Sequence, residues 1–256
     1  MPRSLATHFT GSEGRQLAAI VDLPDGEVRG RVLFAHCFTC SKDLKAAYWI
    51  GQRLAECGLA MLRFDFAGLG QSEGDFVDTT LSSNIEDLVA AARFMEQEHG
   101  PVGLIVGHSL GGVATLAAAG RVPSARAVCT ISTSFAATHL RRYLVADHGD
   151  AAPSEELQVT LAGRSFRLRR SFVEDLARHD MARIIPELGR PLLVLHAPDD
   201  RVVEMAQAEL IYQAARQPRS IVALDGADHL LTRPVHAHRA ADLIAAWALP
   251  YLLDPA

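Results

Sequence analysis

A serine stands between two glycines at a spacing that favours nucleophilic chemistry. The residues read Gly107-His108-Ser109-Leu110-Gly111, a G-x-S-x-G pattern that follows an apolar run typical of a strand and precedes a run with helical periodicity. A serine on a sharp strand-to-helix turn needs residues without side chains two positions before and two after it, and Gly107 and Gly111 meet that need. The pattern predicts a nucleophile elbow that presents the Ser109 hydroxyl at the N-terminus of a helix.

A serine hydroxyl is a weak nucleophile and needs a base that a carboxylate orients. In this strand–turn–helix context the acid follows the serine in the chain and the histidine comes last. Two adjacent aspartates, Asp199 and Asp200, follow the apolar run 192–195. We favour Asp200 as the acid and expect one of the two to cap a turn. His229 lies just after the last apolar run, so the predicted catalytic residues are Ser109, Asp200 and His229.

Acyl transfer through a serine also requires donors for the oxyanion of the tetrahedral intermediate. One predicted donor is the backbone N–H of Leu110, directly after the serine. The other is the amide of Phe38, in the loop after the apolar run 32–35. That loop reads His36-Cys37-Phe38-Thr39-Cys40.

Short apolar runs alternate with helical patterns along the chain. The runs 32–35, 60–66, 102–106, 125–131, 192–195 and 220–224 are predicted strands, and 44–57, 82–99, 111–121, 204–216 and 234–251 are predicted helices. This alternation predicts an α/β fold with a mostly parallel central sheet and helices on both faces. We also predict an antiparallel lead-in from residues 16–23 and the strand at Arg31.

About sixty residues separate the predicted strands 125–131 and 192–195, too many for a plain connection. We therefore predict a single domain over residues 1–256 with a small cap insertion at about 135–186. Its predicted parts are a helix at 137–146, a polar turn at 149–153, a hairpin of 159–161 and 165–169, and a helix at 172–179. The hairpin should turn Phe166 and Leu168 to one face and Arg167 and Arg169 to the other, solvated face.

Composition limits the classes of partner. The 25 Lys and Arg against 30 Asp and Glu give a net charge of −5, and 49% of residues are hydrophobic, as in an ordinary globular protein. The Lys and Arg residues are scattered along the sequence, so we expect neither nucleic acid nor a membrane surface as a partner. Formation of a homodimer remains an open alternative. Without a signal peptide pattern or a disulfide framework, we expect a cytoplasmic protein with reduced thiols.

Taken together, these motifs resemble the α/β-hydrolase superfamily of serine hydrolases over essentially the whole chain. The run at 63–72 also matches the superfamily's D-x-x-G-x-G-x-S loop. The resemblance implies an α/β-hydrolase fold and ester hydrolysis, an activity for which we expect no cofactor and no metal. The chain departs from the family at Cys37, because His-Gly is frequent there and a Cβ restricts φ.

Three longer runs, 36–43, 63–76 and 224–234, are similar to the hydrolase half of bacterial proteins that fuse it to an OsmC-type hydroperoxide reductase. No residues remain here for the OsmC-type half. The resemblance therefore implies either a stand-alone relative or an excised domain.

Other chemistries remain open from the residues alone. Short acyl groups are the expected substrates because the insertion is too short for a large lid, but a thioesterase, amidase or lactonase would use the same triad. Cys37 and Cys40 form a C-x-x-C that could act as a redox dithiol. A receptor that binds without catalysis is a further alternative. Of the remaining histidines, His36 and His196 are predicted to brace loops and His108 to pack beneath the sheet edge.

Overall fold

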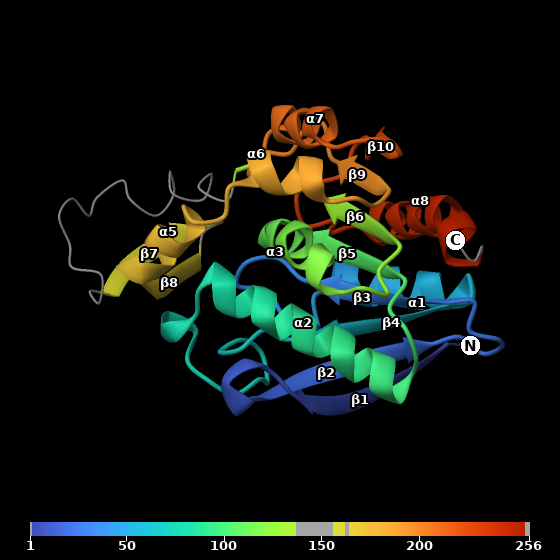
Figure 1. Cartoon of the computed structure of the whole chain (residues 1–256), viewed down its shortest axis with the longest axis horizontal. Helices are drawn as coiled ribbons and strands as arrows, with labels where there is room; N and C mark the ends of the chain where they lie inside the picture. The colour runs from blue at the N-terminus through green and yellow to red at the C-terminus, as the bar shows by residue number, and fades with distance from the viewer. Residues whose placement is uncertain (1, 137–155, 162–163, 254–256) are drawn as a thin grey trace.

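The central element is an eight-stranded sheet with the strand order β1-β2-β4-β3-β5-β6-β9-β10 (Figure 1). The computed structural model describes residues 2–136, 156–161 and 164–253. The strands are β1 (Arg3–Thr10), β2 (Gln16–Leu23), β3 (Gly30–Ala35), β4 (Leu59–Phe64), β5 (Leu104–His108), β6 (Ala127–Ile131), β9 (Leu192–His196) and β10 (Arg219–Ala223). From β4 to β10 all neighbours are parallel. The predicted mostly parallel sheet is confirmed.

Helices cover both faces of the sheet (Figure 1). They include α1 (Lys45–Glu56), α2 (Leu81–Glu98), α3 (Leu110–Ala118), α7 (Met205–Ala214) and α8 (Pro234–Leu253). Alternate residues of β3 enter two separate apolar cores: Leu33 joins the core under α2, α3 and α7, and Phe34 joins the core under α1 and α8. Because both faces are buried, the strands read as continuous apolar runs rather than as alternating ones.

The N-terminal strands differ from the prediction. Residues 16–23 do not pair with the strand at Arg31: β2 pairs antiparallel with β1 and β4, whereas β3 runs parallel to β4 and β5. No apolar run predicts β1, because its side chains are mostly polar and mostly exposed. An edge strand of this kind is held by backbone hydrogen bonds and shows no apolar run.

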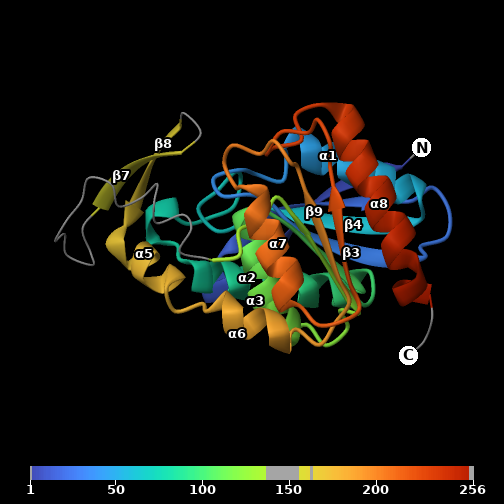
Figure 2. The ribbon, with the colours of Figure 1, turned by 90° about the horizontal axis from the view of Figure 1, so that it is seen from above.

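The predicted hairpin is present as a separate two-stranded sheet of β7 (Glu156–Leu161) and β8 (Arg164–Arg169). It is followed by α5 (Arg170–Leu176), which begins two residues before the predicted helix, and by α6 (Met181–Ile184). Figure 2 shows β7, β8 and α5 at one end of the molecule. The predicted helix 137–146 and polar turn 149–153 lie outside the described residues.

This end of the molecule is tied to the main body by buried groups. The Asp175 carboxylate of α5 accepts hydrogen bonds from the backbone N–H and the hydroxyl of Ser82, at 2.8 and 2.7 Å. Leu168 and Phe172 are fully buried, and Arg169 pairs with Asp78. The apolar face of β8 thus packs inward.

A steric constraint fixes the turn between β5 and α3. Ser109 has φ 56° and ψ −121°, and its N–H donates to the carbonyl of Ile131 on β6 at 2.9 Å. A Cβ on Gly107 would lie 2.5 Å from the Gly111 oxygen, and one on Gly111 would overlap the carbonyl oxygens at the end of β3. The helix can therefore approach the sheet only because both residues are glycine.

Substitution at the turn tests this constraint. We expect Gly107→Ala to destabilise the fold by about 1–3 kcal/mol, because the added methyl meets backbone that cannot yield. Gly120→Ala is the matched control, because a Cβ there meets nothing within 4 Å; it should be neutral or slightly stabilising. Urea unfolding of both variants measures the difference, and equal stabilities would contradict the steric account.

Candidate active site

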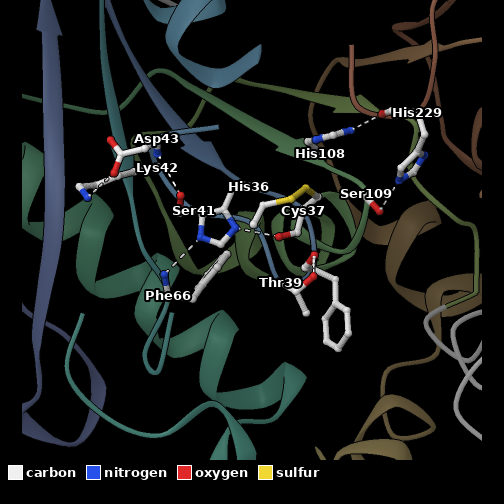
Figure 3. The surroundings of a disulfide bond; sticks show 12 residues. His36, Cys37, Thr39, Ser41, Lys42, Asp43, Phe66, His108, Ser109 and His229 are labelled. Atoms are coloured by element: carbon white, nitrogen blue, oxygen red, sulfur yellow. Dashed lines mark hydrogen bonds and ion pairs between the residues drawn. A yellow bond between two sulfur atoms is a disulfide. The ribbon is translucent and has the colours of Figure 1, made fainter. Parts of the chain in front are cut away.

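Three side chains meet at the carboxyl edge of the sheet. Ser109 follows β5, Asp200 follows β9 and His229 follows β10. The Ser109 Oγ lies 3.1 Å from His229 Nε2, and His229 Nδ1 lies 2.7 Å from Asp200 Oδ2. The structure thus joins the three predicted residues in one hydrogen-bonded chain, part of which is visible in Figure 3.

The carboxylate of Asp200 is held in place by backbone as well as by the histidine. Its Oδ1 accepts hydrogen bonds from the amides of Val202 and Val203, at 2.8 and 2.9 Å. Burial alone would raise the pKa of Asp200, but the hydrogen bond from His229 and these amides outweigh it and hold the pKa below its usual range. The neighbouring Asp199 is exposed, so the structure separates the two aspartates.

His108 connects the elbow to the loop that carries His229. Its Nε2 lies 2.7 Å from the His229 carbonyl oxygen, and the two rings are 5.4 Å apart. Burial lowers the pKa of His108 to about 3, so the ring is neutral and Nε2–H donates to the carbonyl. The sequence predicted a packing role for His108 but not this contact, because nothing in the spacing reveals a partner 121 positions away.

The second predicted oxyanion donor lies in the loop after β3. Within the described residues, the amides of Phe38 and Leu110 donate to no acceptor. Both N–H groups are therefore free to bind an oxyanion. The Cβ of Cys37 causes no strain in φ here, because Cys37 does not have a positive φ. The positive φ of the loop occurs two residues later, at Thr39 with φ 60°.

The same loop contains a disulfide bond between Cys37 and Cys40 (Figure 3). The prediction of reduced thiols is wrong for this pair, whereas Cys57 and Cys129 are free. A turn closed by a hydrogen bond from Cys40 N to Cys37 O brings the two Cα atoms to 5.3 Å, within the range that a disulfide requires. A C-x-x-C pattern alone does not reveal this closure.

Both ends of this loop are fixed by buried polar groups. At the start, the His36 ring lies between the Cys37 carbonyl, at 2.8 Å from Nδ1, and the Phe66 amide, at 3.4 Å from Nε2. At the end, the Lys42 ammonium lies 3.0 Å from Asp65 Oδ2 and 2.7 Å from Gln71 Oε1. The prediction that His36 braces a loop agrees with this geometry, but the buried Lys42–Asp65 pair was not anticipated.

Asp65 also explains the glycines of the D-x-x-G-x-G-x-S loop. Gly70 has φ 54°, and a Cβ there would overlap the Asp65 carboxylate. The Ser72 hydroxyl donates to the Asp65 carbonyl at 2.6 Å and accepts from the Ala18 amide. The loop therefore wraps around an internal carboxylate.

In the part of the chain that the structure describes, no three His, Cys, Asp or Glu side chains gather closely enough to hold a metal ion. Every helix within residues 2–136, 156–161 and 164–253 is too short or too polar to span a bilayer.

Buried neutral histidines should make stability depend on pH. Burial is the main cause that lowers the pKa values of His36, His108 and His196 in the fold. The unfolded chain therefore binds more protons below the ordinary histidine pKa, so we expect the free energy of unfolding to fall between about pH 7 and about pH 5. Urea unfolding at both pH values measures this, and His108→Gln should show a smaller decrease. An equal decrease in the variant would contradict the assignment.

Comparison with known proteins places the chain in a family. A model described as the alpha/beta hydrolase family matches residues 32–246. The esterase domain of a Rhodothermus marinus protein is 41% identical, with 98% of this chain and 99% of that chain covered and a TM-score of 0.82. A monoacylglycerol lipase of Mycolicibacterium smegmatis is 25% identical, with 95% and 96% covered. Est1E of Butyrivibrio proteoclasticus, solved with ferulic acid bound, is 20% identical over 97% of this chain and all of that one, and its TM-score of 0.84 shows a shared fold. The protein described here belongs to the alpha/beta hydrolase family.

Proposed function

We propose that this protein is a serine esterase that hydrolyses carboxylic esters. The observation that carries the proposal is the hydrogen-bonded chain from Ser109 through His229 to Asp200. The similarity to an esterase domain at 41% identity, and to a monoacylglycerol lipase, supports the same reaction class.

In the first half of the proposed reaction, Ser109 Oγ attacks the ester carbonyl carbon while His229 Nε2 takes the hydroxyl proton. The carbonyl oxygen becomes an oxyanion that accepts hydrogen bonds from the amides of Phe38 and Leu110. The bond to the alcohol oxygen then breaks, and His229 returns the proton to that oxygen. The products of this half are the free alcohol and an acyl group on Ser109.

In the second half, a water molecule attacks the acyl carbon. His229 takes its proton, and the oxyanion forms again at the same two amides. When the intermediate collapses, the bond to Ser109 Oγ breaks, His229 gives the proton to Oγ, and the acid is released. Asp200 accepts the Nδ1–H bond throughout, which keeps Nε2 directed at the serine and stabilises the charged ring. Leu110 is the first residue of α3, so the helix dipole adds to the stabilisation of the negative charge.

For the substrate we propose esters with short acyl groups. Phe38, whose backbone supplies one oxyanion donor, packs its ring against Phe76, Phe166 and Phe172 at centroid distances of 5.3, 6.3 and 5.5 Å. We take the four rings beside residues 36–40, the proposed oxyanion loop, as support for a short acyl chain on that side. The modest size of the insertion, between β6 and β9, supports the same preference.

The two aspartates provide a matched test of the triad. We expect Asp200→Asn to lower kcat by about 10⁴-fold, since the amide favours the wrong histidine tautomer, and Asp199→Asn to leave kcat unchanged. The rate of ester hydrolysis by each aspartate variant measures kcat. A fluorophosphonate should label the unmodified protein, and Ser109→Ala should abolish that labelling. Equal losses in both aspartate variants, or labelling of Ser109→Ala, would contradict the proposed assignments.

A series of p-nitrophenyl esters tests the substrate. We expect kcat/KM to be highest for acyl chains of two to four carbons and to fall for longer ones, because the rings beside Phe38 occupy the space. Phe166→Ala should move the optimum toward longer chains. An optimum at long chains in the unmodified protein would contradict the preference, and thioester, amide and lactone substrates in the same series would reveal a different reaction class.

A further inference from the structure

We propose that the Cys37–Cys40 disulfide is a thiol–disulfide exchange site for dithiol reductants, and that opening it inactivates the oxyanion loop. The inference rests on the proposed esterase function. It assigns to the disulfide a role in regulation at the same site.

The disulfide encloses Phe38, whose backbone N–H is a proposed oxyanion donor. Only Phe38 and Thr39 lie between the two cysteines, and the Phe38 amide is one of the two proposed oxyanion donors. Figure 3 draws Ser109 and His229 among the surroundings of the disulfide. A change in the backbone between the cysteines therefore acts directly on the position of the oxyanion.

The backbone between the cysteines needs to be held. Thr39 has φ 60°, a conformation that is unfavourable for a β-branched residue and persists only where its surroundings enforce it. Besides the disulfide, the turn contains a backbone hydrogen bond from Cys40 N to Cys37 O at 3.1 Å and one from the Thr39 hydroxyl to the Phe38 carbonyl at 2.6 Å, and the Phe38 ring packs against its aromatic neighbours. The disulfide is the covalent closure that joins the two ends of this turn, and it acts with these contacts to keep Thr39 in its conformation and the Phe38 N–H in place.

The flanks of the loop do not depend on the disulfide. His36 and Lys42 are anchored to Phe66 and Asp65. Opening the disulfide should therefore release the turn itself and leave the fold intact, as a reversible switch requires.

The disulfide is also within reach of a reductant. Cys40 is partly exposed, whereas Cys37 is only 3% exposed. One thiolate of a dithiol can attack Cys40 Sγ, which forms a mixed disulfide and releases Cys37 as a thiolate. The second thiolate of the reductant then attacks the reductant sulfur that is bonded to Cys40, and Cys40 leaves as a thiolate. Two electrons pass to the protein, the two cysteines take up the two protons, and the reductant leaves as a cyclic disulfide.

The other cysteines are unsuited to this exchange. Burial raises the pKa of Cys57 and, more strongly, that of the fully buried Cys129, so both thiols are poor nucleophiles. They provide the controls for the experiment below.

The experiment compares the oxidised protein with protein reduced by dithiothreitol, which is then removed without air. Thiol counting on the unfolded protein should give two thiols before reduction and four after it. We expect kcat for p-nitrophenyl acetate to fall at least tenfold on reduction, toward the roughly 10²–10³-fold loss typical of one missing oxyanion donor, with little change in KM. Oxidised glutathione, a stronger oxidant than the cyclic disulfide of dithiothreitol, should restore kcat.

Two variants test whether the loss of kcat comes from opening the Cys37–Cys40 turn or from another effect of dithiothreitol. Cys40→Ser should show the low kcat of the reduced protein and no response to dithiothreitol, whereas Cys57→Ser should keep the full response. Circular dichroism and thermal unfolding verify that the reduced protein and Cys40→Ser are folded. If Cys40→Ser does not fold, the reduction and reoxidation of Cys57→Ser provides the test.

The outcomes distinguish the two proposals. Equal kcat in the oxidised and reduced protein, or four thiols that oxidised glutathione cannot convert to two, would overturn the redox inference and leave the esterase proposal standing. Absence of ester hydrolysis in every redox state would instead contradict the proposed function.

Discussion

The close crossing of β5 and α3 is the constraint on which the site depends. Because Gly107 and Gly111 carry no side chains, the helix approaches the backbone at the end of β3, and Ser109 takes a left-handed conformation at the point of contact. The same approach brings the Leu110 amide, at the start of α3, beside the loop that follows β3. Ser109 and the proposed donor at Leu110 are thus positioned by one packing contact.

Neutral, buried histidines extend this arrangement across the sheet edge. His108 joins the turn after β5 to the His229 loop, His196 lies 2.8 Å from the Val203 carbonyl beside Asp200, and His36 holds the start of the loop after β3. An imidazole kept neutral by burial donates from one nitrogen only, so each contact has a defined direction. The loops after β3, β9 and β10 are therefore each anchored by a histidine at the end of a strand.

The sequence allowed the fold to be predicted wherever burial leaves a periodic signal. The parallel strands and long helices were found within a few residues, and the three residues of the hydrogen-bonded chain follow from the order of strand ends. β1 was missed because an exposed edge strand has no apolar pattern, and β2 was paired wrongly because pairing depends on the whole sheet. The disulfide, the His108 contact and the Lys42–Asp65 pair depend on turns and long-range packing, which a local pattern does not encode.

The central claim is that Ser109 attacks the substrate with the amides of Phe38 and Leu110 around the oxyanion. A crystal structure after reaction with an alkyl phosphonate tests it most directly, because the phosphonyl oxygen stands in for the oxyanion. The account predicts phosphorus bonded to Ser109 Oγ and an oxygen roughly 2.7–3.1 Å from both amide nitrogens. Phosphorus on another residue, or that oxygen directed away from both amides, would contradict it.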